Sequence, residues 1–257
     1  MPHRKKQPEP LALAVIGGTG LYRMPGLADP GERVLDTPYG RPSAAVMTGR
    51  LDGHAVAFLA RHGTAHDIAP HHVNYRANLW LLRELGARRV LAVNAVGGIR
   101  ADMGPRVLAV PHQIVDYTHG RVSSYCDAEG AKVVHVDLSE PYTESLRLRL
   151  IEAAGAAGGG VVQNGVYGAT QGPRLETAAE IERMRRDGCD LVGMTGMPEA
   201  ALARELGLEY ACLALVANWA AGCGGAAAIS LDEIYENLEA ATARVPAIVR
   251  ELLQRLA

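Results

Sequence analysis

Short apolar runs that end in glycine-rich turns are the feature that most constrains the fold of this chain. Residues 11–16 (LALAVI) are followed by Gly-Gly-Thr-Gly at 17–20, and residues 90–93 lead into Asn-Ala-Val-Gly-Gly at 94–98. Apolar runs of this length between turn signals are typical of buried strands. Between them, residues 73–86 carry apolar side chains at helical spacing and end in glycine. This alternation predicts an α/β domain.

The alternation continues to the end of the chain. We expect further strands or sheet-edge segments near residues 44–48, 55–60, 107–111, 161–167, 191–193 and 210–216. Helices are expected near residues 143–157, 176–187, 198–206 and 231–256, the last of them kinked at Pro246.

The composition fits one domain with an aliphatic core. The chain has 257 residues, of which 48% are hydrophobic and 21% charged, and phenylalanine occurs once. Aliphatic residues of this kind build parallel sheets that are buried on both faces. We expect residues 11–257 to form a single domain and the basic residues 1–10 to be a disordered tail.

Charge and cysteine usage limit the partners and the compartment. The formal net charge of −2 indicates neither a nucleic-acid partner nor a membrane partner. The four cysteines lack C-x-x-C spacing, and no secretory signal or membrane span is evident. We therefore expect free thiols in a cytoplasmic protein.

Residues 170–220 carry three polar patches, each next to an apolar run. Ligands of open α/β sheets bind where strand ends give way to loops and helix starts, so this stretch predicts a small-molecule site. Two other segments suit an anion. The turn that contains Thr19 fits either a phosphate loop or a plain turn, and Arg61-His62 follows an expected strand and offers donors for phosphate oxygens.

Four histidines, at positions 62, 66, 71 and 72, lie close together in the sequence. Neither an H-E-x-x-H motif nor a complementary set of cysteine and carboxylate ligands accompanies them. We therefore predict that this segment binds no metal.

Several motifs occur together and in order: GGTGLY, ARHG, VNYRANLW, NAVGG, QGPRLET and GMTGMPEA, followed by Asn218 at a strand end. Over residues 11–256 the chain thereby resembles the trimeric purine nucleoside phosphorylases, most closely the branch that acts on methylthioadenosine and methylthioinosine. The resemblance implies a single three-layer α/β/α domain with a mixed central sheet. It also implies a homotrimeric pentosyltransferase of purine salvage that uses phosphate as second substrate, with no metal and no organic cofactor.

The resemblance also assigns roles to individual residues. It places the phosphate against a set of polar and backbone groups, namely Thr19, Arg61, His62, Asn94 (largely through its backbone), Ala95 and Thr195. Met194 is expected to lie under the ribose. Asn218 is expected to be the catalytic donor at N7 of the purine, where negative charge grows as the glycosidic bond stretches.

Hydrogen-bond chemistry predicts which purine is bound. The amide of Asn218 can donate to O6 and N7 of a 6-oxopurine, and the carboxylate of Glu176 can accept from its N1–H. Methylthioadenosine phosphorylases usually carry aspartate at the position of Asn218 and a second one at the position of Ala220. Hypoxanthine is therefore favoured over adenine, and Leu175, Trp219 and Ala220 are expected to line the same pocket.

The sugar's 5′ end is expected to meet an apolar wall. Leu231, Ile234 and Tyr235 occupy the segment where phosphorylases that act on inosine place a histidine, and such a wall suits a methylthio group. Leu231 and Ile234 could instead be core contacts of the last helix. His135 matches a family position that reaches the 5′ pocket of a neighbouring subunit.

These residues together predict phosphorolysis of S-methyl-5′-thioinosine to hypoxanthine and 5-methylthioribose 1-phosphate. Two alternatives within the family are a general 6-oxopurine nucleoside phosphorylase acting on inosine and guanosine, and a methylthioadenosine phosphorylase. A hydrolytic nucleosidase would use water and leave the predicted anion site at Arg61, His62 and Thr195 without an anion. A non-catalytic nucleotide-binding module is the remaining alternative.

Overall fold

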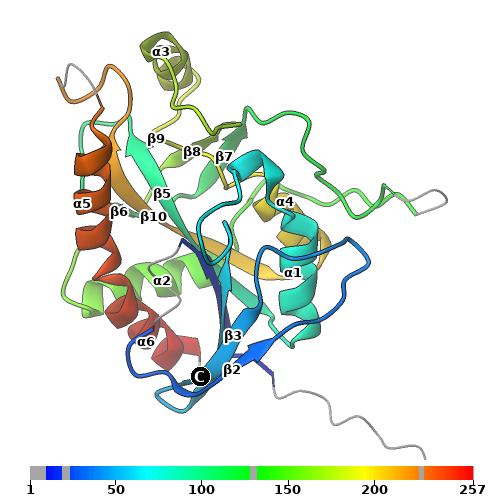
Figure 1. Cartoon of the computed structure of the whole chain (residues 1–257). Helices are drawn as coiled ribbons and strands as arrows, with labels where there is room; N and C mark the ends of the chain where they lie inside the picture. Colours follow the sequence, from blue (N-terminus) through cyan, green and yellow to red (C-terminus); the bar gives the residue numbers. More distant parts are fainter. Residues whose placement is uncertain (1–9, 19–23, 128–131, 226–228, 257) are drawn as a thin grey trace, which may run out of the picture.

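A ten-stranded sheet runs through the computed structural model, which describes residues 10–18, 24–127, 132–225 and 229–256 (Figure 1). The strands are β1 (Leu13–Gly17), β2 (Ala28–Arg33), β3 (Val46–Leu51), β4 (His54–Ala60), β5 (Arg89–Gly98), β6 (Leu108–Ala109), β7 (Gln113–Asp116), β8 (Val166–Ala169), β9 (Leu191–Gly193) and β10 (Glu209–Trp219). The helices are η2 (Pro70–His72), α1 (Tyr75–Glu84), α2 (Glu144–Ala156), α3 (Ala178–Arg186), α4 (Glu199–Glu205), α5 (Leu231–Thr242) and α6 (Val245–Leu256).

The sheet is mixed, as expected. Its strand order is β2-β3-β4-β1-β5-β9-β8-β7, and β10 pairs with β5 and β6. The centre is parallel, since β1 pairs in parallel with β4 and β5, and β10 pairs in parallel with β5. Antiparallel pairs join β2 to β3, β3 to β4, β5 to β9 and β6 to β10. The carboxyl ends of β1, β4, β5 and β10 therefore meet at one edge, where ligands of such sheets bind.

Helices cover both faces of the sheet and make the third layer that the resemblance implies. One buried cluster includes Leu79 and Leu82 of α1 and Leu202 of α4. The opposite cluster includes Leu150 of α2 and Leu252 of α6. Figure 1 shows α1 and α4 on one side of the central strands and α2, α5 and α6 on the other. The core is mainly aliphatic on both faces, as the composition predicts, but the cluster under α1 and α4 also buries four tyrosines: Tyr75, Tyr142, Tyr167 and Tyr210.

The C-terminal part differs from the expected single kinked helix. Two helices form instead, α5 and α6, and the chain breaks between them at residues 243–244. Pro246 is the second residue of α6 and does not kink a continuous helix. Proline lacks the N–H of a helix interior but is tolerated in the first turn, where that group has no partner, so the proline marks a start.

Two further differences concern the ends of the chain and its strands. Residues 28–33 form an edge strand that the sequence pattern did not indicate, because five of its six residues are exposed. The expected tail at residues 1–10 lies outside the described residues except for Pro10. In the part of the chain that is described, no helix has the length and apolar character needed to cross a membrane.

The close approach at the end of β5 gives a stability test. A Cβ on Gly98 would lie 1.7 Å from the carbonyl oxygen of Met103, whereas a Cβ on Gly155 of α2 would meet nothing within 4 Å. We expect Gly98→Ala to lower the free energy of unfolding by about 3 kcal/mol through overpacking. Gly155→Ala should leave it unchanged or raise it by about 0.5 kcal/mol through helix propensity. Urea unfolding at matched protein concentration measures both, and equal stabilities would contradict this packing.

Candidate active site

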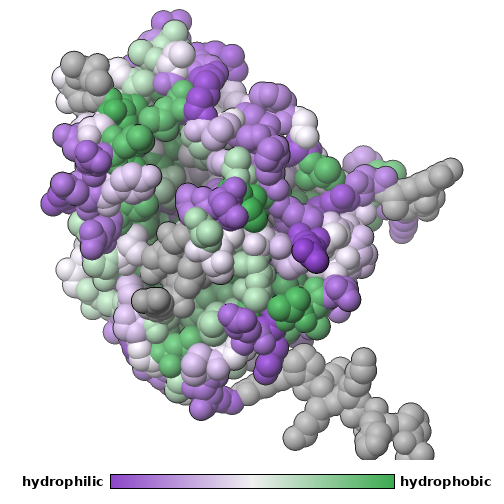
Figure 2. Space-filling model, viewed as in Figure 1, coloured by the Kyte–Doolittle hydropathy of each residue, from purple (hydrophilic) through white to green (hydrophobic). Residues whose placement is uncertain are grey.

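A pocket of about 1010 Å³ opens at the edge where the strand ends meet. Most of the residues expected to bind substrate or phosphate line it: Arg61, His62, Ala95, Leu175, Glu176, Met194, Thr195, Asn218, Ala220, Leu231, Ile234 and Tyr235. They come from segments far apart in the sequence, at the ends of β4, β5, β9 and β10 and on α5. Figure 2 shows apolar side chains gathered around a recess between α3 and the start of α5.

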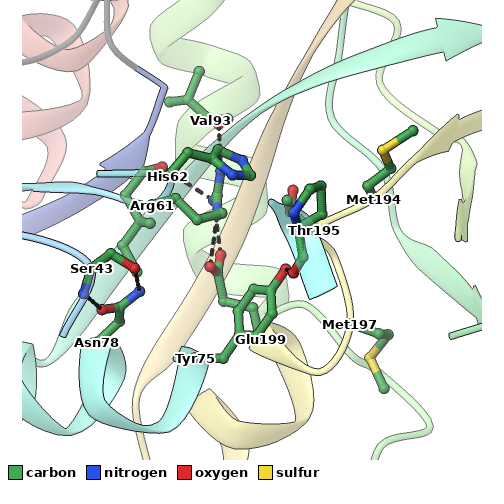
Figure 3. Close-up of polar contacts among 12 residues, drawn as sticks. Ser43, Arg61, His62, Tyr75, Asn78, Val93, Met194, Thr195, Met197 and Glu199 are labelled. Atoms are coloured by element: carbon green, nitrogen blue, oxygen red, sulfur yellow. Dashed lines mark hydrogen bonds and ion pairs between the residues drawn. The ribbon is translucent and has the colours of Figure 1, made fainter. Parts of the chain in front are cut away.

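Arg61 is held in a buried ion pair directly after β4. Its guanidinium is bidentate to Glu199, with Nε 2.8 Å from Oε2 and Nη2 2.9 Å from Oε1 (Figure 3). It also donates to the carbonyl oxygens of Val93 and Ile16, at 3.1 and 3.3 Å. Tyr210 donates its hydroxyl to the same carboxylate at 2.9 Å. Most of the N–H donors of Arg61, which we expected to be available to an anion, are thus bound to other groups of the protein.

The ion pair keeps Arg61 charged despite burial. Burial disfavours the cation, but the adjacent Glu199 carboxylate outweighs this and raises the pKa of Arg61 above its ordinary value. Because the two charges cancel, Arg61 adds little net positive charge to the pocket that it lines. One N–H of Nη1 has no partner among the described residues and remains for a ligand.

His62, the next residue, is a neutral imidazole. Its Nδ1 lies 2.9 Å from the carbonyl oxygen of Ile68, which assigns the proton to Nδ1. Burial and the neighbouring charge of Arg61 lower the pKa of His62 to about 4. The free Nε2 then carries a lone pair. Towards a phosphate it can accept a hydrogen bond from a P–OH group.

The carboxylate of Glu176, the expected reader of the base, is held by a threonine that sequence reasoning missed. Thr170 donates its hydroxyl to Oε1 of Glu176 at 2.6 Å, and its own backbone N–H bonds to Gly193 at 2.8 Å. Thr170 is buried, with 7% of its surface exposed. Its position at the carboxyl end of β8, six residues before Glu176, is the sequence feature that could have indicated this role.

A β-bulge in β10 decides which side chains face the pocket. The pairing of β10 with β5 shifts register between Val216 and Asn218. Leu215 lines the pocket before the bulge, Ala217 within it, and Asn218 and Ala220 after it. Strand side chains alternate, so one extra residue exchanges the two faces.

The bulge corrects the expectation for Trp219. Its indole turns away from the pocket and lies against Gly104 and Gly224. Only its carbonyl oxygen serves the site, by accepting a 2.7 Å hydrogen bond from Nδ2 of Asn218. That contact fixes the amide orientation and leaves the second N–H of Nδ2 for a ligand.

Two other expected residues lie away from the pocket wall, and a third cannot be placed against it. Asn94 is 1% exposed, and both ends of its amide lack a partner among the described residues, while its neighbours Val93 and Ala95 line the pocket. His135 is exposed and does not line the pocket of its own chain, so its expected reach into a neighbouring subunit stays a prediction. Thr19 lies outside the described residues.

The expected 5′ wall is the open side of the pocket. Leu231 and Tyr235 line it with 63% and 67% of their surfaces exposed, and Leu175 opposite is 41% exposed. Ile234 is half-buried beside them. They are therefore not core contacts of α5 but apolar side chains at the pocket mouth.

The region around the histidines gives no metal site. Within residues 10–18, 24–127, 132–225 and 229–256, no group of three histidine, cysteine or acidic side chains is arranged to hold a metal ion. The four cysteines are free thiols. That the reaction needs neither a metal nor an organic cofactor stays a prediction.

The strand ends of this α/β sheet enclose polar groups for an anion beside a pocket for a small molecule. This arrangement defines the class of protein: an enzyme that brings these two ligands together. The family model described as "Phosphorylase superfamily" matches residues 12–254. The chain belongs to the phosphorylase superfamily, and the enzyme is a pentosyltransferase.

Named relatives and a solved structure agree with this assignment. The chain is 59% identical to a "Probable S-methyl-5'-thioinosine phosphorylase" of Xanthomonas campestris, over 94% of this chain and 97% of that protein. A protein of the same name from Xylella fastidiosa is 54% identical, over 94% and 98%. A methylthioadenosine phosphorylase from an antarctic soil metagenomic library superposes with a TM-score of 0.90 at 35% identity, covering 96% of this chain and 86% of that chain. The predicted family and fold are confirmed.

The neutral state of His62 predicts acid sensitivity. Its pKa is lowered in the folded state from 6.5 to about 4, so the unfolded chain binds a proton in this range that the folded chain does not. The contribution of His62 to stability is complete above pH 6.5 and is lost as the pH falls towards 4. Between pH 7.5 and pH 5 the ligand-free protein should lose about 2 kcal/mol more unfolding free energy than His62→Asn does. Urea unfolding at both pH values measures this, and equal losses would contradict the assignment.

Proposed function

We propose that the enzyme catalyses the phosphorolysis of S-methyl-5′-thioinosine, giving hypoxanthine and 5-methylthioribose 1-phosphate. The observation that carries the proposal is that Asn218 and Glu176 face the same pocket as Arg61, His62 and Thr195. An amide and a carboxylate suit a 6-oxopurine, and the other three suit an anion. The similarity to the Xanthomonas relative, a probable S-methyl-5'-thioinosine phosphorylase, supports this substrate.

The proposed reaction follows from these groups. A phosphate oxygen attacks C1′ from the face opposite the purine, the C1′–N9 bond breaks, and the base leaves with the electron pair. The base then gains, through solvent, the proton that the phosphate P–OH gives up. Negative charge that grows on the ring is stabilised by the free N–H of Asn218 at N7, a contribution of the order of 3 kcal/mol for one such donor. His62 accepts the P–OH hydrogen bond and so orients the attacking phosphate.

Further parts of the proposal rest on the family rather than on one contact. Phosphate is the co-substrate, without metal or organic cofactor, and Asn94, Ala95 and Thr19 contribute to its binding. Asn94 fits this role because its buried amide is unpaired among the described residues. We also propose a homotrimer in the cytoplasm, in which His135 of one chain reaches the 5′ pocket of another.

A second candidate is a general 6-oxopurine nucleoside phosphorylase. The exposure of Leu231 and Tyr235 favours it, because a 5′ hydroxyl at an open mouth can stay hydrated. Methylthioadenosine is disfavoured by Glu176, whose carboxylate would face the bare N1 of a 6-aminopurine, where two acceptors meet without a donor. A hydrolytic nucleosidase would leave the pocket's anion groups unused.

A substrate panel tests the proposed function. Release of free base is followed with methylthioinosine, inosine and methylthioadenosine, each with and without phosphate. We expect turnover only with phosphate, with the highest kcat/KM for methylthioinosine. Preference over inosine should reach about 10²-fold at most, since an apolar pocket rejects a hydroxyl only weakly. Turnover without phosphate contradicts the phosphorylase proposal, and preference for inosine favours the second candidate.

The role of Asn218 has its own test. Asn218→Asp replaces a donor by an acceptor, so the ratio of kcat/KM for methylthioadenosine to that for methylthioinosine should rise about 10²-fold. Asn164→Asp makes the same change of charge at an exposed asparagine outside the pocket and should leave the ratio unchanged. An unchanged ratio in Asn218→Asp would show that this residue does not select the base.

A further inference from the structure

Arg121 connects two loops of the active site, residues 170–176 and 194–198, through several hydrogen bonds from one guanidinium. Its Nη1 donates to the carbonyl oxygens of Met194 at 2.8 Å and Met197 at 2.6 Å. Its Nη2 donates to those of Thr170 at 3.1 Å and Gln171 at 2.8 Å. Its Nε donates to the side-chain oxygen of Gln171 at 3.1 Å. A single half-buried side chain thus bonds to the start of both loops.

The two loops carry different parts of the site. Residues 170–176 follow β8 and end at Glu176, the proposed reader of the purine. Residues 194–198 follow β9 and contain Met194 and Thr195, which line the pocket on the ribose and phosphate side in our proposal. The guanidinium between them therefore fixes where the base is held relative to where the phosphate is held. Because a misplacement of about 1 Å can cost roughly 10²-fold in rate, this spacing matters for catalysis.

Arg121 also brings a positive charge that no acidic partner cancels. Its acceptors are neutral carbonyl and amide oxygens and the hydroxyl of Tyr75, at 3.2 Å. Its guanidinium also lies over the ring of Tyr75, 5.6 Å from the centroid. In the described part of the chain, Arg121 forms no ion pair with a carboxylate.

The residues proposed to bind phosphate do not themselves provide a free positive charge. Arg61 is paired with Glu199, and His62 is neutral, so neither supplies a free positive charge to an incoming dianion. Arg121 lies close enough to His62 that its charge helps to lower the pKa of that ring. The field of a cation in a partly dehydrated site attracts an anion even without direct contact.

We propose that Arg121 is a positioning residue of the reaction: it fixes loops 170–176 and 194–198 to each other and supplies the uncompensated positive charge for the anionic co-substrate. The second half rests on the proposed function, whereas the first half does not. If Arg121 had only a structural role, a charged and a neutral replacement would have the same effect on phosphate binding.

The test compares two replacements of Arg121 with matched controls. Arg121→Lys keeps the charge but loses the planar fork, and Arg121→Met loses both. Arg147 is the control, because it is also largely buried but is paired with Glu144 and donates to the carbonyl oxygen of Gln163, away from the pocket. Arg147→Lys and Arg147→Met remove comparable contacts without touching the site.

Hydrogen exchange tests the loop function without any substrate. Peptides covering 170–176 and 194–198 should exchange at least about tenfold faster in both Arg121 variants than in the Arg147 variants. Unchanged exchange in these peptides would overturn the fixing of the loops. Since no nucleoside is present, this result stands whatever substrate the enzyme proves to use.

Calorimetry with inorganic phosphate tests the charge. The Kd for phosphate should rise about tenfold or more in Arg121→Met and stay within about threefold in Arg121→Lys, because a unit charge is lost only in the first. In turnover, Arg121→Lys should lower kcat with little change in the KM for phosphate. Equal phosphate Kd values in the two variants would overturn the electrostatic role. If the wild type binds phosphate but shows no phosphorolysis, the proposed function fails while this comparison still decides the role of Arg121.

Discussion

The buried ion pair between Arg61 and Glu199 is the contact on which the active site depends. It joins the end of β4 to the first turn of α4 and, through Tyr210, to β10, and the same guanidinium holds carbonyl oxygens of β1 and β5. Two charges taken out of water are tolerated only when each is fully paired, so these elements must all be in place together. The pair ties the formation of the anion site to the packing of the sheet, and a partly folded chain would have no such site.

Electrostatic balance in the site follows from this pairing. A free arginine and a protonated histidine would hold a phosphate dianion tightly, and tight binding of a reactant does not by itself speed its reaction. Here the arginine is compensated and the histidine is neutral, with the remaining positive charge at Arg121, outside direct ion pairs. Such an arrangement attracts phosphate while leaving its oxygens reactive. The nucleophile is then oriented by hydrogen bonds more than it is neutralised.

Much of the fold and the pocket could be predicted from the sequence, because buried strands that end in glycine-rich turns are local signals. The pocket contains most of the residues that the family motifs indicate. What could not be predicted depends on contacts between distant segments. Glu199 sits 138 positions from its partner Arg61, and Arg121 is an ordinary loop arginine until two other loops surround it. The helix break before Pro246 and the outward turn of Trp219 were missed because a proline at a helix start and an extra strand residue leave no periodic signal.

The bulge in β10 makes the chemistry of the pocket depend on backbone geometry as well as on side-chain identity. It is held by the backbone N–H of Arg106, which donates to Val216 at 2.7 Å, and by Asn237 of α5, whose amide donates to Ala217 at 3.0 Å. If the bulge were lost with all residues kept, regular alternation beyond Leu215 would bring Trp219 to the pocket face, and an indole would stand where an amide now stands. Arg106 and Asn237 do not line the pocket, yet by holding the bulge they decide which side chain faces a bound purine.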